Sequence, residues 1–279
     1  MTVLHETRPV KAVDEIQDWS HVRGYGWRPQ LPDSRDMVYA PRLTSLPPEH
    51  DLRPQMPPVY DQGQLGSCTG NAIAGAMEYE RDRQGMSDFV PSRLFVYYNE
   101  RALEGTVSSD SGAVIRDGIK VVNSEGVCPE TLWPYNIGMF AVKPPHRCYV
   151  AATKDKAVRY EAIQTLGDLK DAIASNLSVV FGFTVYESFE SQAVARTGLM
   201  PLPKKGEAVV GGHAVLAVGY SDAKRHIIVR NSWGASWGDH GYFYMPYQYL
   251  TGSKASADSS PVSHAHLASD FWAIQAVSS

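Results

Sequence analysis

The stretch Asp61-Gln-Gly-Gln-Leu-Gly-Ser-Cys68-Thr-Gly-Asn-Ala does most to decide which fold this chain adopts. A glycine-rich loop ends at a cysteine, and apolar residues then recur at three- and four-residue spacing from residue 67 to residue 85. That spacing predicts a helix with Cys68 in its first turn. Free N–H groups at a helix start stabilise negative charge, so we expect the Cys68 thiol to be more acidic than an ordinary thiol. For Cys68 taken alone, a buried and inert cysteine is the competing interpretation.

The rest of the chain divides into helical patterns followed by strand patterns. Helical spacing, with a capping box at Thr165 and Asp168 in the last case, predicts further helices over residues 91–105, 113–123 and 165–176. Short β-branched or aromatic runs predict strands over residues 178–186, 213–220, 225–231 and 241–245. Helices first and strands second favour an α+β fold with two sub-domains and a site in the cleft between them.

A second motif is Gly211-Gly-His213-Ala-Val-Leu-Ala-Val-Gly-Tyr220. His213 begins a strand pattern directly after two glycines, which are too small to cover it, so its imidazole can face a cleft. A core histidine satisfied by backbone groups is the alternative for this motif alone.

A third motif is Asn231-Ser-Trp233-Gly-Ala-Ser-Trp237-Gly, which follows a predicted strand. An asparagine oxygen can accept a hydrogen bond from one imidazole nitrogen and fix the tautomer, while an indole shields that bond from water. An aromatic-rich turn without function is the alternative.

The three motifs are more specific together than singly. His213 follows Cys68 by 145 residues and Asn231 follows it by 163, close to the spacing of about 130–150 residues in papain-type enzymes. The chain resembles the papain-like cysteine peptidases, most closely their bacterial branch, from about residue 46 to the end. Leu46-Pro-Pro-Glu-His-Asp51-Leu-Arg53 is similar to the start of a mature family enzyme.

The resemblance implies a papain-like fold, with a helical half and an antiparallel β half, and a role for each motif residue. Cys68 is implied as the nucleophile, His213 as its proton partner, Asn231 as the residue that orients His213, and Gln62 as an oxyanion donor together with the Cys68 backbone N–H. Gln64 is the rival to Gln62, which we prefer for its six-residue offset from Cys68. The residues implied in substrate binding are Gly112, Gly212, Ala214 and Trp233, with Trp233 also covering the His213–Asn231 bond.

The chain also departs from the family pattern. Relatives usually carry a disulfide between two positions that are Leu65 and Ser109 in this chain. They usually have an aromatic residue directly after the nucleophile, where this chain has Thr69. Both partners of that bond are missing together, which fits a chain made where disulfides are disfavoured. Cys128 and Cys148 either pair with each other or remain two reduced thiols.

Composition excludes several other classes of protein. The 279 residues are 43% hydrophobic and 20% charged, which is typical of a folded globular chain. The 26 basic and 30 acidic residues give a net charge of -4, which does not indicate the basic surface of a nucleic-acid-binding protein. The longest apolar stretch, residues 177–186, is half the length of a membrane span. We recognise no secretory signal, so the expectation is a cytoplasmic protein or one exported by a non-standard route, without cofactor or metal, and monomeric.

Residues 1–45 precede the peptidase domain predicted over residues 46–279. By resemblance they occupy the place of an inhibitory prosegment, although they are short for one. Trp19, Tyr25 and Trp27 are costly to leave in water, and Pro29 and Pro32 favour an extended path. We therefore expect this segment to dock on the peptidase and to cross or abut its cleft as an intramolecular inhibitor. The alternative is a flexible tail that does not dock.

The leading hypothesis is a cysteine endopeptidase that cleaves polypeptides through an acyl-enzyme. An amidase or acyl transferase using the same triad is the enzymatic alternative. A catalytically inactive peptide-binding protein is less favoured, because Gln62, Cys68, His213 and Asn231 are all present. The absence of paired cysteine ligands and of a His-Glu-x-x-His motif argues against a zinc site.

Overall fold

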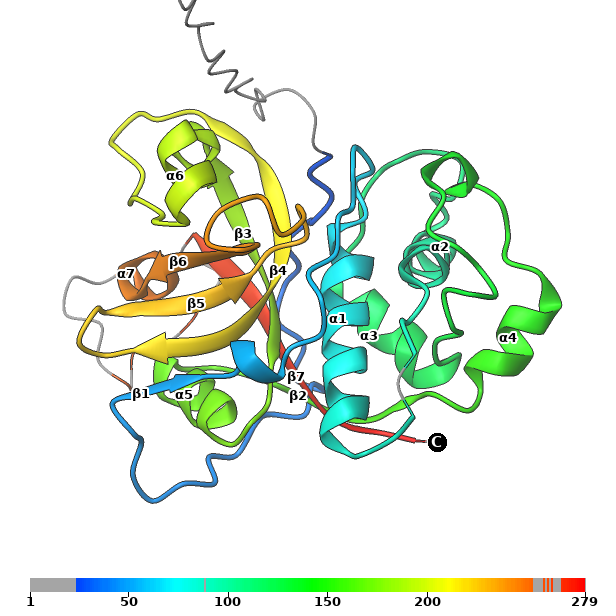
Figure 1. Ribbon diagram of the computed structural model, residues 1–279, viewed down its shortest axis with the longest axis horizontal. Helices are drawn as coiled ribbons and strands as arrows, with labels where there is room; N and C mark the ends of the chain where they lie inside the picture. The colour runs from blue at the N-terminus through cyan, green and yellow to red at the C-terminus, as the bar shows by residue number, and fades with distance from the viewer. Residues whose placement is uncertain are drawn as a thin grey trace, which may run out of the picture.

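The structure is a computed structural model that describes residues 24–87, 89–252, 258, 260, 262 and 267–278. It has two halves, one mainly helical and one built on a β-sheet (Figure 1). The predicted α+β architecture, with a helical half and an antiparallel β half, is confirmed.

The helical half contains α1 (Cys68–Arg83), α2 (Arg93–Glu104), α3 (Ile115–Ser124) and α4 (His146–Ala152). Helix α1 is buried around nearly its whole circumference, and small residues allow its close packing: a Cβ at Gly70 would lie 2.8 Å from the Arg93 carbonyl oxygen on α2. The side chain of Ser92 caps α2, and Gly105 ends it in the left-handed conformation. Pro91, which we predicted to be the first helical residue, lies before that cap.

The β half is one antiparallel sheet of seven strands. The strands are β1 (Glu49–Asp51), β2 (Ala157–Ala162), β3 (Val179–Tyr186), β4 (Val209–Ser221), β5 (His226–Arg230), β6 (Tyr242–Pro246) and β7 (Ala268–Val277). Their order is β2-β7-β3-β4-β5-β6, and β1 pairs with β4. The four predicted strands are confirmed, but β4 begins at residue 209 rather than 213 because Gly211 and Gly212 pair with Val185 and Thr184 of β3.

Three further helices lie against the sheet: α5 (Leu166–Ala174), α6 (Gln192–Thr197) and α7 (Tyr247–Thr251). The predicted capping box is present at the start of α5, where Thr165 and Asp168 each accept a hydrogen bond from the other's backbone N–H. Such a cap stabilises a helix by about 1 kcal/mol. Short 3₁₀ turns occupy Arg53–Gln55, Ile137–Met139 and Glu187–Glu190.

The two halves share one hydrophobic core, in which α1 packs on β4. The first residue of α1 and the first half of β4 therefore meet at the boundary between the halves, and the stretch that begins at residue 24 runs along this boundary (Figure 1). Among the described residues, no helix combines the length and the apolar composition needed to cross a bilayer.

Candidate active site

Cys68 begins α1 and its side chain is fully buried. Burial raises the pKa of its thiol to about 11, although backbone hydrogen bonds from Ala214, Gly26 and Thr69 act in the opposite direction. The prediction of an acidic thiol is therefore wrong: of these bonds only that from Thr69 belongs to the helix start, and dehydration of the thiol outweighs all three. The bond from Ala214 places the thiol beside the residue that follows His213.

His213 lies on β4 and is held by Asn231, which follows β5. The His213 Nε2 and Asn231 Oδ1 atoms are 2.8 Å apart, and the same oxygen accepts the backbone N–H of Ser232 at 2.8 Å. The second bond fixes the orientation of the amide. Since the oxygen can only accept, Nε2 carries the proton and Nδ1 is left as the nitrogen that can exchange one.

The indole of Trp233 stacks on the His213 imidazole, with ring centres 4.9 Å apart and an angle of 29° between the planes. Phe183 meets the imidazole edge-on at 5.8 Å. Trp233 is only 3% exposed, so the His213–Asn231 bond is shielded from water.

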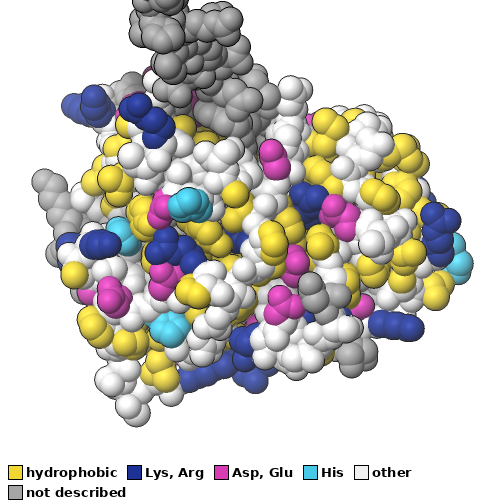
Figure 2. Space-filling view, in the orientation of Figure 1, with side chains coloured by type: hydrophobic (Ala, Val, Ile, Leu, Met, Phe, Trp, Pro, Cys, Tyr) yellow, Lys and Arg dark blue, Asp and Glu magenta, His cyan; other side chains and the backbone are white. Residues whose placement is uncertain are grey.

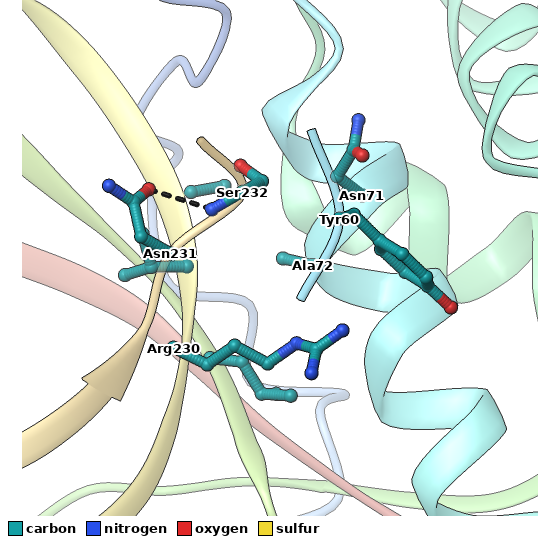
Figure 3. A pocket seen from close by; sticks show the side chains of 9 residues that line it. Tyr60, Asn71, Ala72, Arg230, Asn231 and Ser232 are labelled. Atoms are coloured by element: carbon teal, nitrogen blue, oxygen red, sulfur yellow. Dashed lines mark hydrogen bonds between the residues drawn. The ribbon is translucent and has the colours of Figure 1, made fainter. Parts of the chain in front are cut away.

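Next to Asn231 and Ser232, α1 and the sheet line a cavity of about 10 Å³. This volume is the lower limit for one water molecule. Figure 3 shows Asn231 with its hydrogen bond to Ser232 on one side of this cavity, and Tyr60, Asn71 and Ala72 on the other. The floor of the site is therefore closely packed, which favours a fixed position for Asn231.

Gln62 is also fully buried. Its Nε2 donates to the carbonyl oxygens of Leu65, at 2.9 Å, and Gly24, at 3.1 Å, and its Oε1 accepts from Ser232 Oγ at 2.5 Å. The amide donor that we assigned to an oxyanion thus points at a carbonyl oxygen of the N-terminal segment. The rival residue, Gln64, is exposed.

The N-terminal segment forms backbone hydrogen bonds with both walls of the site. Trp27 N–H donates to the Gly212 carbonyl at 3.0 Å, and the Gly26 carbonyl accepts Ala113 N–H at 2.7 Å. The segment lies very close to Gly112, because a Cβ on this residue would be 1.9 Å from the Gly26 carbonyl oxygen. The φ of Gly112, +67°, also favours glycine. Gly112, Gly212 and Ala214 therefore all lie beside the segment or the thiol.

Two aromatic side chains of this segment bind the β half. The Trp27 indole packs on Gly182 and Gly212, and its Nε1 donates to Asp270 Oδ2 at 3.1 Å. The Tyr25 ring meets the edges of His213 and Trp233 at 5.9 and 6.0 Å. The Tyr25 hydroxyl donates to Glu190 at 2.6 Å.

The following part of the segment is also bound to the β half. Tyr39 is buried, and its hydroxyl donates to Asp171 of α5 at 2.7 Å. The backbone N–H groups of Arg42 and Leu43 donate to the same carboxylate, each at 2.9 Å. Trp19, which we also expected to dock, lies outside the described residues.

Sequence reasoning did not identify Asp270, Gly182 or Ser232 as parts of the site. Asp270 has a φ of +60°, and burial raises the pKa of its carboxyl to about 6. No motif surrounds it, and it contacts Trp27 across 243 residues of chain. Ser232 belongs to the Asn-Ser-Trp motif, so that motif is the signal that could have marked it, although its bond to Gln62 was not predicted.

Cys128 and Cys148 lie away from this site, in a small buried cluster with Phe95 and Ala152. Both are free thiols, and a side-chain hydrogen bond joins them. Within the described part of the chain, no group of three His, Cys, Asp or Glu side chains is arranged to hold a metal ion. Figure 2 shows basic and acidic side chains interspersed over the viewed face.

Comparisons with known proteins show the family to which the chain belongs. Residues 46–261 match the family model described as papain family cysteine protease. An uncharacterized peptidase C1-like protein of Acanthamoeba polyphaga mimivirus is 43% identical, over 91% of this chain and 88% of its own. The crystal structure of xylellain, a cysteine protease from Xylella fastidiosa, is 43% identical, with a TM-score of 0.81 over 91% of this chain and 96% of that chain. Pro-cathepsin H from Bos taurus is 29% identical, over 80% of this chain and 67% of its own. The chain therefore belongs to the papain family of cysteine proteases.

Proposed function

We propose that this protein is a cysteine endopeptidase that hydrolyses peptide bonds through a thioester acyl-enzyme, with Cys68, His213 and Asn231 as its triad. The observation that carries this proposal is the 2.8 Å bond between His213 Nε2 and Asn231 Oδ1, beside a cysteine at a helix start. That bond leaves Nδ1 to exchange a proton with the Cys68 thiol.

The reaction follows from these positions. His213 takes the thiol proton, and the Cys68 sulfur attacks the substrate carbonyl carbon. Gln62 Nε2 and the Cys68 backbone N–H then stabilise the negative oxygen, and His213 returns the proton to the leaving amine. Water, deprotonated by His213, attacks the thioester carbon and releases the acid product and the free thiol.

A polypeptide fits this site better than a non-protein amide. Ala113 and Gly212 each hydrogen-bond to the backbone of residues 26–28 in an extended stretch, so the cleft presents a peptide-binding edge. This edge favours endopeptidase activity over the amidase or acyl transferase alternative. An inactive peptide-binding protein is less favoured because the triad and Gln62 are all present and close together.

We also propose that residues 24–28 hold the enzyme in a latent state. The Gly24 oxygen occupies the Gln62 donor, a backbone hydrogen bond joins Gly26 to the thiol, and Trp27 fills the space over Gly182 and Gly212. A substrate must displace all three. Residues 1–45 thus act as the inhibitory prosegment of a zymogen, with the peptidase domain over residues 46–279.

The test of the endopeptidase proposal uses the full chain with Gly26→Ala, called the open variant below. A Cβ on Gly26 would lie 1.7 Å from the Gly66 carbonyl oxygen, so alanine forces the segment away from the cleft. We expect an epoxysuccinyl thiol reagent, mapped by mass spectrometry, to label Cys68 and neither Cys128 nor Cys148. Adding Cys68→Ala to the open variant is expected to abolish labelling and peptide hydrolysis while the fold remains. Equal hydrolysis with and without Cys68 would disprove the proposal.

A further inference from the structure

A carboxylate outside the triad touches the loop that carries the nucleophile. Asp110 accepts the backbone N–H of Gly66 through both of its oxygens, at 2.9 and 3.1 Å. Gly66 is two residues before Cys68, and the carbonyl oxygen of its neighbour Leu65 accepts from Gln62 Nε2. The peptide bond between Leu65 and Gly66 therefore links Asp110 to the oxyanion donor.

The same carboxylate reaches the peptide-binding edge through a tyrosine. The Tyr97 hydroxyl on α2 donates to Asp110 Oδ1, and its oxygen accepts the backbone N–H of Gly112 at 3.2 Å. Ala113, the next residue, is the one that bonds to the segment in the cleft. Asp110 thus connects the nucleophile loop with the opposite wall of the site.

A buried arginine holds the loop on which Asp110 lies. Arg101 Nη1 donates to the carbonyl oxygens of Val107 and Ser109, each at 3.0 Å, and its guanidinium lies 4.1 Å from the Tyr97 ring centre. The side chain of Arg101 is fully buried. Neither residues 61–67 nor residues 106–112 include a cysteine, so no disulfide joins these two loops.

We propose that Asp110 is a positioning residue for peptide hydrolysis. It places the Gln62 amide and the start of α1 through Gly66, and it places the Gly112 edge through Tyr97. This role rests on the proposed endopeptidase function. Without the carboxylate, the plane of the Leu65–Gly66 peptide can tilt. The oxyanion donor and the nucleophile are then no longer aligned on the same carbonyl group of the substrate.

The test adds a second substitution to the open variant and measures both peptide hydrolysis and alkylation of Cys68 by iodoacetamide. Iodoacetamide is a small reagent that needs neither the oxyanion donor nor the peptide-binding edge. Asp110→Ala is expected to lower kcat about 10- to 100-fold, as misplacement of an oxyanion donor does, and to leave the alkylation rate within about twofold. Asp110→Asn retains an acceptor oxygen for Gly66 and is expected to recover most of kcat. Tyr97→Phe removes the bonds of the hydroxyl to Gly112 and to Asp110 but leaves both Asp110 oxygens on the Gly66 N–H, so it is expected to raise KM with kcat nearly unchanged.

The matched control is Asp117→Ala, which removes an aspartate paired with Lys120 on α3 and is expected to change neither rate. Hydrolysis by Asp110→Ala within twofold of the open variant would overturn the positioning role. So would a parallel loss of hydrolysis, alkylation and melting temperature, because a merely structural carboxylate has that effect. An open variant that hydrolyses no peptide overturns the endopeptidase proposal itself, and this role with it.

Discussion

Residues 211–233 and residues 24–28 meet at the Cys68 thiol, but different kinds of contact attach them to the protein. The first region lies on β4 and the turn after β5, surrounded by Phe183 and the packed core. The second is joined to the two walls by a few backbone hydrogen bonds and anchored by the side chains of Tyr25 and Trp27.

This difference separates a permanent part of the site from a displaceable one. We expect removal of the His213 or Asn231 side chain to lower hydrolysis, and removal of the Trp27 side chain to expose the thiol. Variants in the two regions should therefore change thiol reactivity and hydrolysis in opposite directions.

The largest expected effect belongs to the permanent region. In the open variant, His213→Ala is expected to lower kcat by about 10²–10⁴-fold, because the imidazole moves the proton in every step. Asn231→Ala only releases the orientation of that ring, so we expect a smaller loss, up to about 10²-fold. Steady-state kinetics on one fluorogenic peptide compares the two. Equal losses, or the reverse order, would show that the roles of base and orienting residue are assigned wrongly.

A smaller effect is expected from the displaceable region in the otherwise unchanged full chain. Trp27→Ala removes a buried indole, and truncations of this size cost about 3–5 kcal/mol. Because this cost falls on docking of the segment, Cys68 should become more reactive toward iodoacetamide at pH 7. Leu31→Ala, at a side chain that is 82% exposed, is the control and should not change the rate. A Trp27→Ala protein that reacts no faster than the control would mean that the indole does not hold the segment.

The smallest effect concerns stability and involves neither region. Glu100 is fully buried and accepts a hydrogen bond from Thr69, next to Cys68, and burial raises the pKa of its carboxyl to about 8. The folded state therefore holds a proton that the unfolded state has lost, and the stability gained from it disappears as pH rises toward 8. Glu100→Gln is expected to flatten this decline, so its melting temperature should exceed that of the parent at pH 8–9. The two proteins should melt alike near pH 4; a constant difference across this range would contradict the assignment.

Strong local signals explain which elements were predictable. Helix α5 has its capping box, and β3, β4, β5 and β6 are compact β-branched or aromatic runs between turn residues. Strands β2 and β7 were not predicted. They pair with each other across more than a hundred residues, their register shifts near Arg159, and Asp270 interrupts the extended backbone of β7 with a positive φ.

The residues of the candidate site also differ in whether a local sequence pattern marks them. Cys68, His213, Asn231 and Gln62 stand in local motifs, so their sequence neighbours reveal them. The contact of Trp27 with Asp270 joins distant parts of the chain, and no local pattern marks it. The acidity of Cys68 was wrongly predicted for a related reason: the helix start is a local feature, whereas the burial that raises the pKa of the thiol arises from the packed tertiary structure.

The most direct test of this account is the pH dependence of Cys68 alkylation in the full chain, compared between the parent and Gly26→Ala. Gly138→Ala is the matched control, since an added Cβ there lies 3.4 Å from its nearest neighbour, an ordinary contact. In the parent and the control, alkylation should be slow at pH 7 and rise toward pH 11, because burial raises the pKa of the thiol to about 11. In Gly26→Ala, rehydration of the thiol should outweigh the loss of the Gly26 hydrogen bond, a bond that by itself lowers the pKa, so alkylation should become fast at pH 7 and the profile should shift to lower pH. Superimposable profiles for the three folded proteins would contradict the claim that residues 24–28 cover the nucleophile.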